Sequence, residues 1–188
     1  MLNIYKIFER PETLPLYNEL ASKFELFKSP RDWNPNMISE LEPVKPIITR
    51  TPRLAFPYAA YVLQGRFPAG EPYIMKDADM AYSYAKEVLG HRWPEAEPYI
   101  AKNPEHAFAY AEHVLDGRFE QAEPYMLKDI ESSTYYAMNI MQKRWPAYEK
   151  EMHKILADED YEDEYSGMDH EMIVDLWDEY VEHFGVDE

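Results

Sequence analysis

The sequence of 188 residues contains no cysteine, no glycine-rich phosphate loop and no long apolar run. Without cysteine there is no disulfide framework, no thiolate metal site and no cysteine nucleophile. No segment approaches the ~18 to 20 apolar residues that cross a bilayer, and residues 1–16 lack the apolar core of a signal peptide. We therefore expect a soluble, cytoplasmic protein with no membrane partner.

Positive charge is missing from one end of the chain. The sequence has 36 acidic and 19 basic residues, and residues 155–188 hold 14 of the acidic residues without a single lysine or arginine. Residues 1–154 together have a net charge of only −3. Because a basic footprint for phosphate backbones is absent, we expect no direct binding to nucleic acid.

What the chain does have is enough apolar sequence for a core and a strong internal repeat. Apolar residues make up 46% of the sequence and aromatic residues 15%, which excludes wholesale disorder. Arginines recur every 26 residues, each followed by Phe or Trp, and tyrosines recur in the same register. These positions are Arg66, Arg92, Arg118 and Arg144, with Tyr58, Tyr84, Tyr110 and Tyr136.

Each repeat predicts a pair of helices. Ala107, Tyr110, Ala111 and Val114 have the spacing of an amphipathic helix, which we expect over residues 104–116. Asn103 is its predicted N-cap, as Asp77 and Asp129 are in the neighbouring copies, and Pro104 fits the first helical position. Gly65 and Gly117 are predicted to take the left-handed conformation that ends a helix. Residues 94–102 predict a second, short helix.

The predicted fold class is therefore all-α, with short helix-turn-helix repeats stacked as a small solenoid between helical end caps. We expect three regions along the chain. Residues 1–46 form an N-terminal helical cap with an irregular lead-in from residue 28. Residues 47–154 form four 26-residue repeats, and residues 155–188 form an acidic segment with an amphipathic helix.

The repeated phrase Tyr-Ala-x-x-Val-Leu-x-Gly-Arg-Phe/Trp, followed by Glu-Pro-Tyr-Ile/Met, resembles a tandem repeat of hypothetical proteins of tailed bacteriophages. The resemblance covers residues 47 to about 149, which is more than half of the chain. It implies a virally encoded accessory protein in the cytoplasm of an infected bacterium. It carries no catalytic residue over to this sequence.

Two interpretations apply to the repeated arginines and tyrosines. The arginines could line a stripe that binds phosphate or acidic groups, but we favour ion pairs with the glutamates five residues on, which are Glu71, Glu97, Glu123 and Glu149. The Tyr58 series could stack on bases, but without a basic groove we favour packing in the core.

Positions that vary between the copies are candidates for a specific binding surface. They show no charge pattern that identifies a partner. These positions are Arg53, Asp79, Glu105 and Glu131, with Tyr61, Glu87, His113 and Asn139.

No pattern indicates a catalytic or metal site. His106 and His113 are two helical turns apart, too far for one ion, and no His-Glu-x-x-His pattern occurs. The acidic run at residues 158–164, with Asp169, is typical of a calcium loop only in its charge, since Asp163 stands where the loop needs glycine. We predict no cofactor, no metal and no enzymatic activity.

The acidic C-terminal segment is the main candidate for function. Ile173, Leu176, Trp177 and Tyr180 share one helical face, which predicts a helix docked on the last repeat. Its carboxylates would form an acidic surface for a host protein with a basic surface, in defence, transcription or replication. The candidate residues are Asp163, Glu164, Asp175, Asp178, Glu179 and Glu182. The alternatives are a self-associating structural scaffold and, less favoured, a metal-dependent hydrolase or nuclease.

Overall fold

A computed structural model of the chain describes residues 41–158 and 168–186. These residues form ten α-helices and no β-strand, which confirms the prediction of a mostly helical protein. They fall into two compact units, with the boundary after Ile74. The predicted cap at residues 1–40 and the candidate residues Asp163 and Glu164 lie outside the described residues.

The first unit holds the first repeat and the residues before it. Its elements are η3 (Glu42–Val44), α3 (Lys45–Arg50), α4 (Pro52–Pro57), η4 (Tyr58–Leu63) and α5 (Glu71–Ile74). The prediction of irregular structure was wrong for residues 42–46, because Pro43 and Pro46 stand in first helical turns, where a missing N–H leaves no bond unmade. Gly70 is needed for close packing, since a Cβ there would lie 2.5 Å from the Phe67 ring.

The second unit contains seven α-helices, three of which continue into a π-helical turn. In chain order they are α6 (Ala78–Tyr84) with η5 (Ala85–Leu89), α7 (Glu97–Ile100), α8 (Pro104–Tyr110) with η6 (Ala111–Leu115), α9 (Glu123–Met126), α10 (Ile130–Tyr135) with η7 (Tyr136–Met141), α11 (Pro146–Ile155) and α12 (His170–Phe184). The predicted long helix at residues 104–116 and the predicted short helix within 94–102 are both present.

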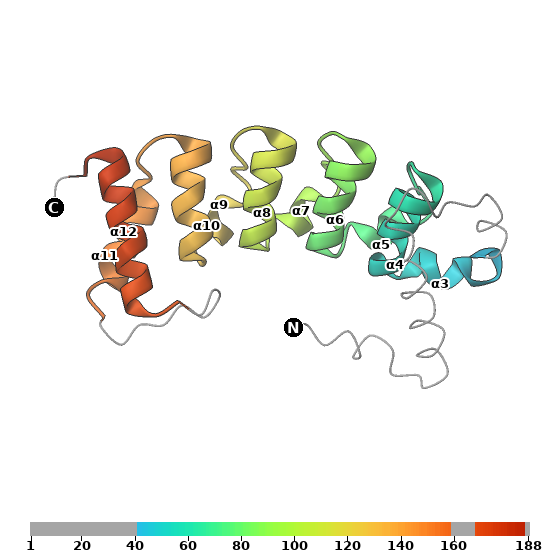
Figure 1. Cartoon of the computed structure of the whole chain (residues 1–188), viewed down its shortest axis with the longest axis horizontal. Helices are drawn as coiled ribbons and strands as arrows, with labels where there is room; N and C mark the ends of the chain where they lie inside the picture. Colours follow the sequence, from blue (N-terminus) through green and yellow to red (C-terminus); the bar gives the residue numbers. More distant parts are fainter. Residues whose placement is uncertain (1–40, 159–167, 187–188) are drawn as a thin grey trace. The chain divides into compact units, whose positions relative to one another are not determined.

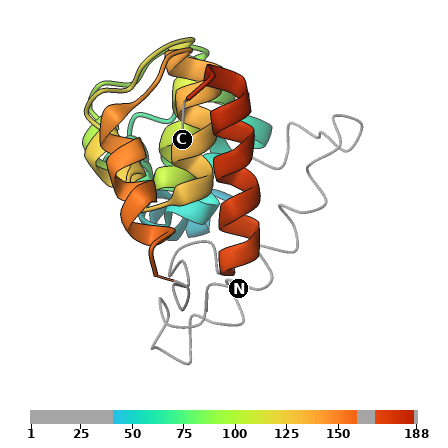
Figure 2. The same cartoon turned by 90° about the vertical axis from the view of Figure 1, so that its left-hand side faces the viewer.

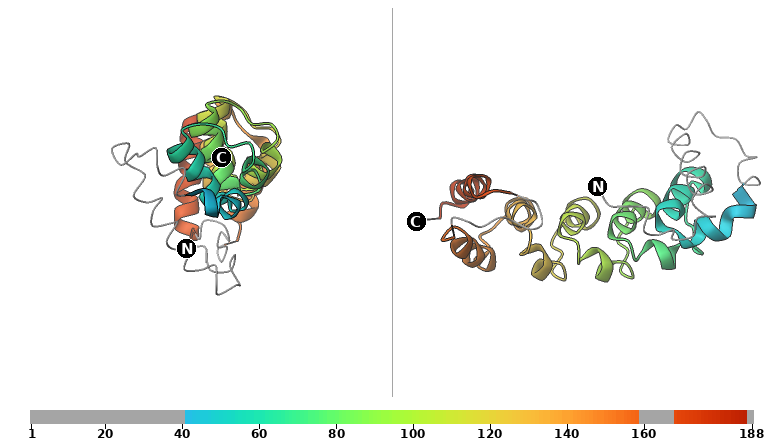
Figure 3. Two further views of the ribbon diagram at one scale, coloured as in Figure 1. Left: turned by 90° about the vertical axis from the view of Figure 1, so that its right-hand side faces the viewer. Right: turned by 90° about the horizontal axis from the view of Figure 1, so that it is seen from below.

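The helices of the second unit form two rows. Helices α6, α8, α10 and α12 make one row, in which each helix contacts the next (Figure 1). The short helices α7 and α9, with α11, make the second row, as the end view and the view from below show (Figures 2 and 3). A single helix of this length cannot bury its own apolar face, so contact between the rows is what creates the core.

The core repeats with the sequence. Tyr84, Tyr110 and Tyr136 are fully buried in the first row, each followed by an equally buried alanine. Tyr58 is buried in the same way within the first unit, so the predicted core role of this tyrosine series is confirmed. The small alanines let neighbouring helices approach closely, and the rings fill the space between the rows.

Helix starts follow the predicted caps. The side chains of Asp77, Asn103 and Asp129 each accept a hydrogen bond from the backbone N–H three residues on. Asp169 does the same at the start of α12, where its carboxylate accepts from the N–H of Met172. Each cap pairs one of the N–H groups that a helix start leaves without an intrahelical partner.

Helix ends differ from the prediction. The left-handed residues that follow the π-helical turns are Gln64, Gly90, Asp116 and Gln142, so the left-handed position lies one residue before Gly65 and Gly117. The π-helical turn is the reason: the Ala111 carbonyl accepts the N–H of Asp116, five residues on, and also the N–H of Gly117. The chain therefore reverses at Asp116, whose short polar side chain tolerates this conformation.

The two glycines should respond in opposite ways to the same substitution. Gly90 has φ of 67°, so Gly90→Ala is expected to lower the free energy of unfolding by about 1 kcal/mol. Gly117 has no positive φ and an added Cβ would meet only a carbonyl oxygen at 3.9 Å, so Gly117→Ala should leave stability unchanged or raise it by up to about 1 kcal/mol. Urea unfolding of both variants checks this; a larger loss at Gly117 than at Gly90 would contradict it.

Candidate functional site

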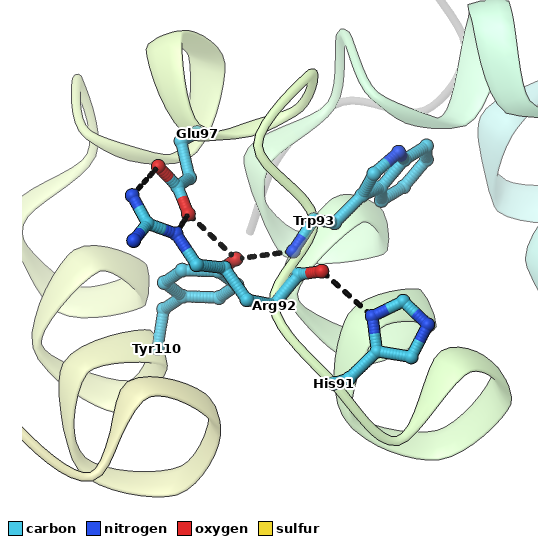
Figure 4. A network of polar contacts seen from close by, with 5 residues as sticks. All are labelled: His91, Arg92, Trp93, Glu97 and Tyr110. Carbon is cyan, nitrogen blue, oxygen red and sulfur yellow. Dashed lines mark hydrogen bonds and ion pairs between the residues drawn. The ribbon is translucent and has the colours of Figure 1, made fainter.

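The repeated arginines form ion pairs with the glutamates five residues on. The guanidinium of Arg92 donates through Nε and Nη2 to the two carboxylate oxygens of Glu97, with Nη2 to Oε2 at 2.8 Å (Figure 4). The same pairing joins Arg66 to Glu71, Arg118 to Glu123 and Arg144 to Glu149. The favoured interpretation of the arginines is therefore confirmed, and their charge is neutralised within each repeat.

Three of these ion pairs, those of Glu97, Glu123 and Glu149, also hold a buried tyrosine. The Tyr110 hydroxyl accepts the backbone N–H of Trp93 at 2.7 Å and donates to Glu97 Oε1 at 3.2 Å (Figure 4). Tyr136 repeats this arrangement with the N–H of Phe119 at 2.7 Å and with Glu123 at 3.1 Å. A buried N–H needs such a partner, because an unpaired one costs about 1–3 kcal/mol.

The aromatic residues after Arg92, Arg118 and Arg144 each link two successive helices of the first row. The ring of Trp93 packs on Tyr84, with ring centroids 5.0 Å apart, while its N–H binds Tyr110 of the next helix. The Phe119 ring packs on Tyr110 at 5.3 Å in the same way. Ring contact on one side and hydrogen bond on the other therefore join each helix to the next.

Helix α12 completes this series. The Tyr180 hydroxyl accepts the N–H of Trp145 at 2.7 Å and donates to Glu149 at 2.9 Å, while the Trp145 ring packs on Tyr136. Tyr180 therefore takes the place of a fifth repeat tyrosine, although it follows Tyr136 by 44 residues rather than 26. The predicted docking of α12 is confirmed, since Ile173, Leu176 and Tyr180 are buried.

The network changes the titration of its members. Burial, opposed by the hydrogen bond from Trp93, raises the pKa of Tyr110 to about 12. Burial also raises the pKa of Tyr136 and of Tyr180. The hydrogen bonds from Arg144 lower the pKa of the Glu149 carboxyl. The folded protein therefore favours neutral tyrosines beside an ionised glutamate.

The candidate carboxylates of α12 lie on its exposed side. Asp175, Asp178, Glu179 and Glu182 are all exposed, and none has an ion-pair partner in the part of the chain that the structure describes. Glu179 is close enough to Tyr135 of α10 to raise the pKa of that phenol, after the larger effect of burial. These four residues are called the acidic face below.

One residue of the acidic face, Asp178, occupies a position that meets the next helix in an earlier repeat. If the sequence of α12 is aligned with that of α8 so that Tyr180 matches Tyr110, Asp178 aligns with Phe108. Phe108 in turn aligns with Tyr82 of α6, one repeat earlier. The Tyr82 ring lies against the rings of His106 and His113 of the following helix. By the same register Asp175 and Glu182 fall on Glu105 and Glu112.

The other candidate positions do not form a site with recognisable chemistry. Of the variable positions in the second unit, Asp79 lies 4.0 Å from His106 Nε2, and the remaining ones are exposed: Glu87, Glu105, His113, Glu131 and Asn139. Arg53 and Tyr61, in the first unit, are half-buried. The rings of His106 and His113 both lie against the Tyr82 ring, with centroid distances of 6.4 and 6.3 Å.

A groove of about 520 Å³ opens between consecutive repeats of the second unit. It is lined by Arg92, Glu97, Val114, Leu115, Gly117, Arg118, Phe119, Glu120 and Gln121. Both of its arginines are paired with glutamates, so the groove does not present unneutralised positive charge to an anion.

The described residues offer neither a cluster of metal ligands nor a helix suited to a bilayer. Within residues 41–158 and 168–186, no group of three or more His, Asp or Glu side chains could hold a metal ion. None of the helices in these two stretches is both long and apolar enough to span a bilayer. The acidic run after Asp158 lies outside them, and Asp169 serves as the cap of α12.

Comparisons with protein-family models, with curated proteins and with solved structures found no significant match.

The equivalence of Tyr180 and Tyr110 can be tested by removing one hydroxyl at a time. Tyr110→Phe and Tyr180→Phe should each lower the free energy of unfolding by about 1–3 kcal/mol, because each leaves a buried N–H without a partner. Tyr99→Phe is the control, since Tyr99 is 36% exposed and its change should stay within about 0.5 kcal/mol. Denaturant unfolding measures all three; a Tyr180→Phe effect as small as the control would exclude the proposed equivalence.

Alkaline pH should destabilise the fold through the buried tyrosines. The pKa of Tyr110 rises from 10 to about 12 on folding, so the unfolded chain loses this proton at a lower pH than the folded one. The stabilisation is complete below pH 10 and decreases as pH rises toward 12. Denaturant unfolding at several pH values should show this decrease, with a shallower slope in Tyr110→Phe. Equal slopes would contradict the assignment.

Proposed function

We propose that the chain is a non-enzymatic protein-binding repeat protein, a short α-solenoid whose acidic face binds a partner protein with a basic surface. The observation that supports this best is the position of the acidic face. Helix α12 is held as the fourth helix of the row, yet it places Asp178 where α6 and α8 have Tyr82 and Phe108. The carboxylate of Asp178 thus stands where the ring of Tyr82 meets the next helix in α6.

The use of the repeated polar residues also supports a binding role. Arg92, Glu97 and Tyr110 satisfy one another, as do their equivalents in the next two copies. A catalytic acid or base must instead be positioned against a substrate proton. The polar residues kept in every copy therefore maintain the stack, and the exposed side chains remain available for recognition.

Electrostatics favours a basic partner. The exposed carboxylates of the acidic face have no ion-pair partner among the described residues, and residues 155–188 contain no lysine or arginine. Such a surface attracts a cationic one over the ~8 to 10 Å that salt leaves unscreened. The resemblance of the repeats to a tailed-phage repeat adds the hypothesis that this partner is a host protein of an infected bacterium.

The function can be tested with two variants of equal charge change. The first replaces the acidic face with amides, as Asp175→Asn, Asp178→Asn, Glu179→Gln and Glu182→Gln. The control replaces four exposed glutamates outside α12, as Glu87→Gln, Glu95→Gln, Glu105→Gln and Glu112→Gln. Because an exposed ion pair contributes about 0.2–1 kcal/mol, the first variant should bind the partner about tenfold more weakly or worse.

The measurement starts with immobilised parent protein and bacterial lysate, followed by titration of the captured partner with each purified variant. Binding should weaken with salt for the parent and for the control. If the variant without the acidic charges binds as tightly as the control, with the same salt dependence, the acidic face is only a solvated cap.

A further inference from the structure

Two large apolar side chains are exposed among the described residues, and they lie on surfaces of opposite charge. Tyr99, on the short helix α7, is 36% exposed. Met172, in the first turn of α12, is 50% exposed. An exposed apolar side chain within a charged surface is a common feature of interaction sites.

The surface around Tyr99 has unpaired positive charge. Lys102 lies over the Tyr99 ring, with Nζ 6.0 Å from the centroid, and Lys128 lies over Tyr125 of α9 at 5.9 Å. Neither lysine has an ion-pair partner among the described residues, although acidic residues outnumber basic ones by 36 to 19. We call these four residues the lysine face.

The sequence motif that forms the lysine face recurs in three repeats. The motif Pro-Tyr-x-x-Lys occurs at residues 72–76, 98–102 and 124–128. The arginine of each repeat is fully paired, whereas this lysine touches only its own tyrosine. A residue that is kept in three copies and left exposed therefore differs from the buried positions that hold the stack together.

Met172 lies beside the carboxylates of the acidic face. Asp175 is three residues further along α12 and Glu179 seven, so the three side chains share one stripe of the helix. Each face thus places unpaired charges of one sign beside an exposed large side chain, which is Tyr99 on the lysine face and Met172 next to the acidic face. A thioether also packs favourably against an aromatic ring.

We propose that two copies of this chain associate, with the acidic face of one copy lying on the lysine face of the other. Charge complementarity between these faces is the observation that selects a second copy as the occupant. Within one chain the two faces do not meet, since Lys102 and Lys128 form no ion pair with α12. The inference rests on the proposed function only in that both use the acidic face, so a basic partner and a second copy compete for it.

Charge reversal on each face tests the association with the purified full-length chain alone. Lys102→Glu with Lys128→Glu reverses one face, and Asp175→Lys with Asp178→Lys reverses the other. The control, Lys86→Glu with Lys143→Glu, makes the same change in net charge on exposed lysines outside the short helices. Circular dichroism confirms the fold of each variant before sedimentation equilibrium is measured over a concentration series.

The parent and the control should increase in mass with concentration, and each reversed variant should associate about tenfold more weakly or worse. A mixture of the two reversed variants should regain association, because opposite charges again face each other. A parent that stays monomeric at every concentration overturns the proposal, and so does a mixture that fails to recover. Neither result depends on a partner protein, so the proposed function is tested separately by the amide variant.

Discussion

The structure depends on one hydrogen bond repeated along the stack, from the backbone N–H of an aromatic residue to the hydroxyl of the next tyrosine. The aromatic ring packs on the tyrosine behind it, and its N–H binds the tyrosine ahead, as Trp93 does between Tyr84 and Tyr110. The glutamate accepts the hydrogen bond of the tyrosine hydroxyl, and the arginine donates to the same carboxylate. Each component is therefore required in every copy, which explains why arginine, aromatic residue and tyrosine recur with one period.

The same period made most of the fold predictable from the sequence. Amphipathic spacing located the long helices, and the five-residue separation between Arg92 and Glu97 predicted their ion pair. The position of the helix stop could not be predicted, because it depends on a π-helical turn that a pattern of apolar residues does not reveal. The Ala111 carbonyl bonds five and six residues on, and the left-handed residue becomes Asp116 rather than Gly117.

The role of α12 was only partly predictable. Its apolar face indicated docking, but the change in spacing from 26 to 44 residues concealed its place in the series. A short signal was present, since Tyr180-Val181-Glu182-His183 matches Tyr110-Ala111-Glu112-His113 at three of four positions. Gly185 bonds Val181 four residues back, whereas Gly90 bonds Ala85 five residues back, so α12 ends without the wide turn. Only the hydrogen bonds of Tyr180 establish the equivalence.

A stack of identical units has no intrinsic end, because each added helix offers the next one the same surface. Open, complementary ends of this kind lead to continued addition of copies unless they are blocked or made specific. Helix α12 keeps the tyrosine that binds the preceding helix, and its Asp178 stands where α6 has Tyr82, whose ring lies against the next helix. The buried side of α12 thus keeps the stacking contacts, while an exposed carboxylate takes the place of an aromatic ring, so an apolar contact at that position would have to bury a charge.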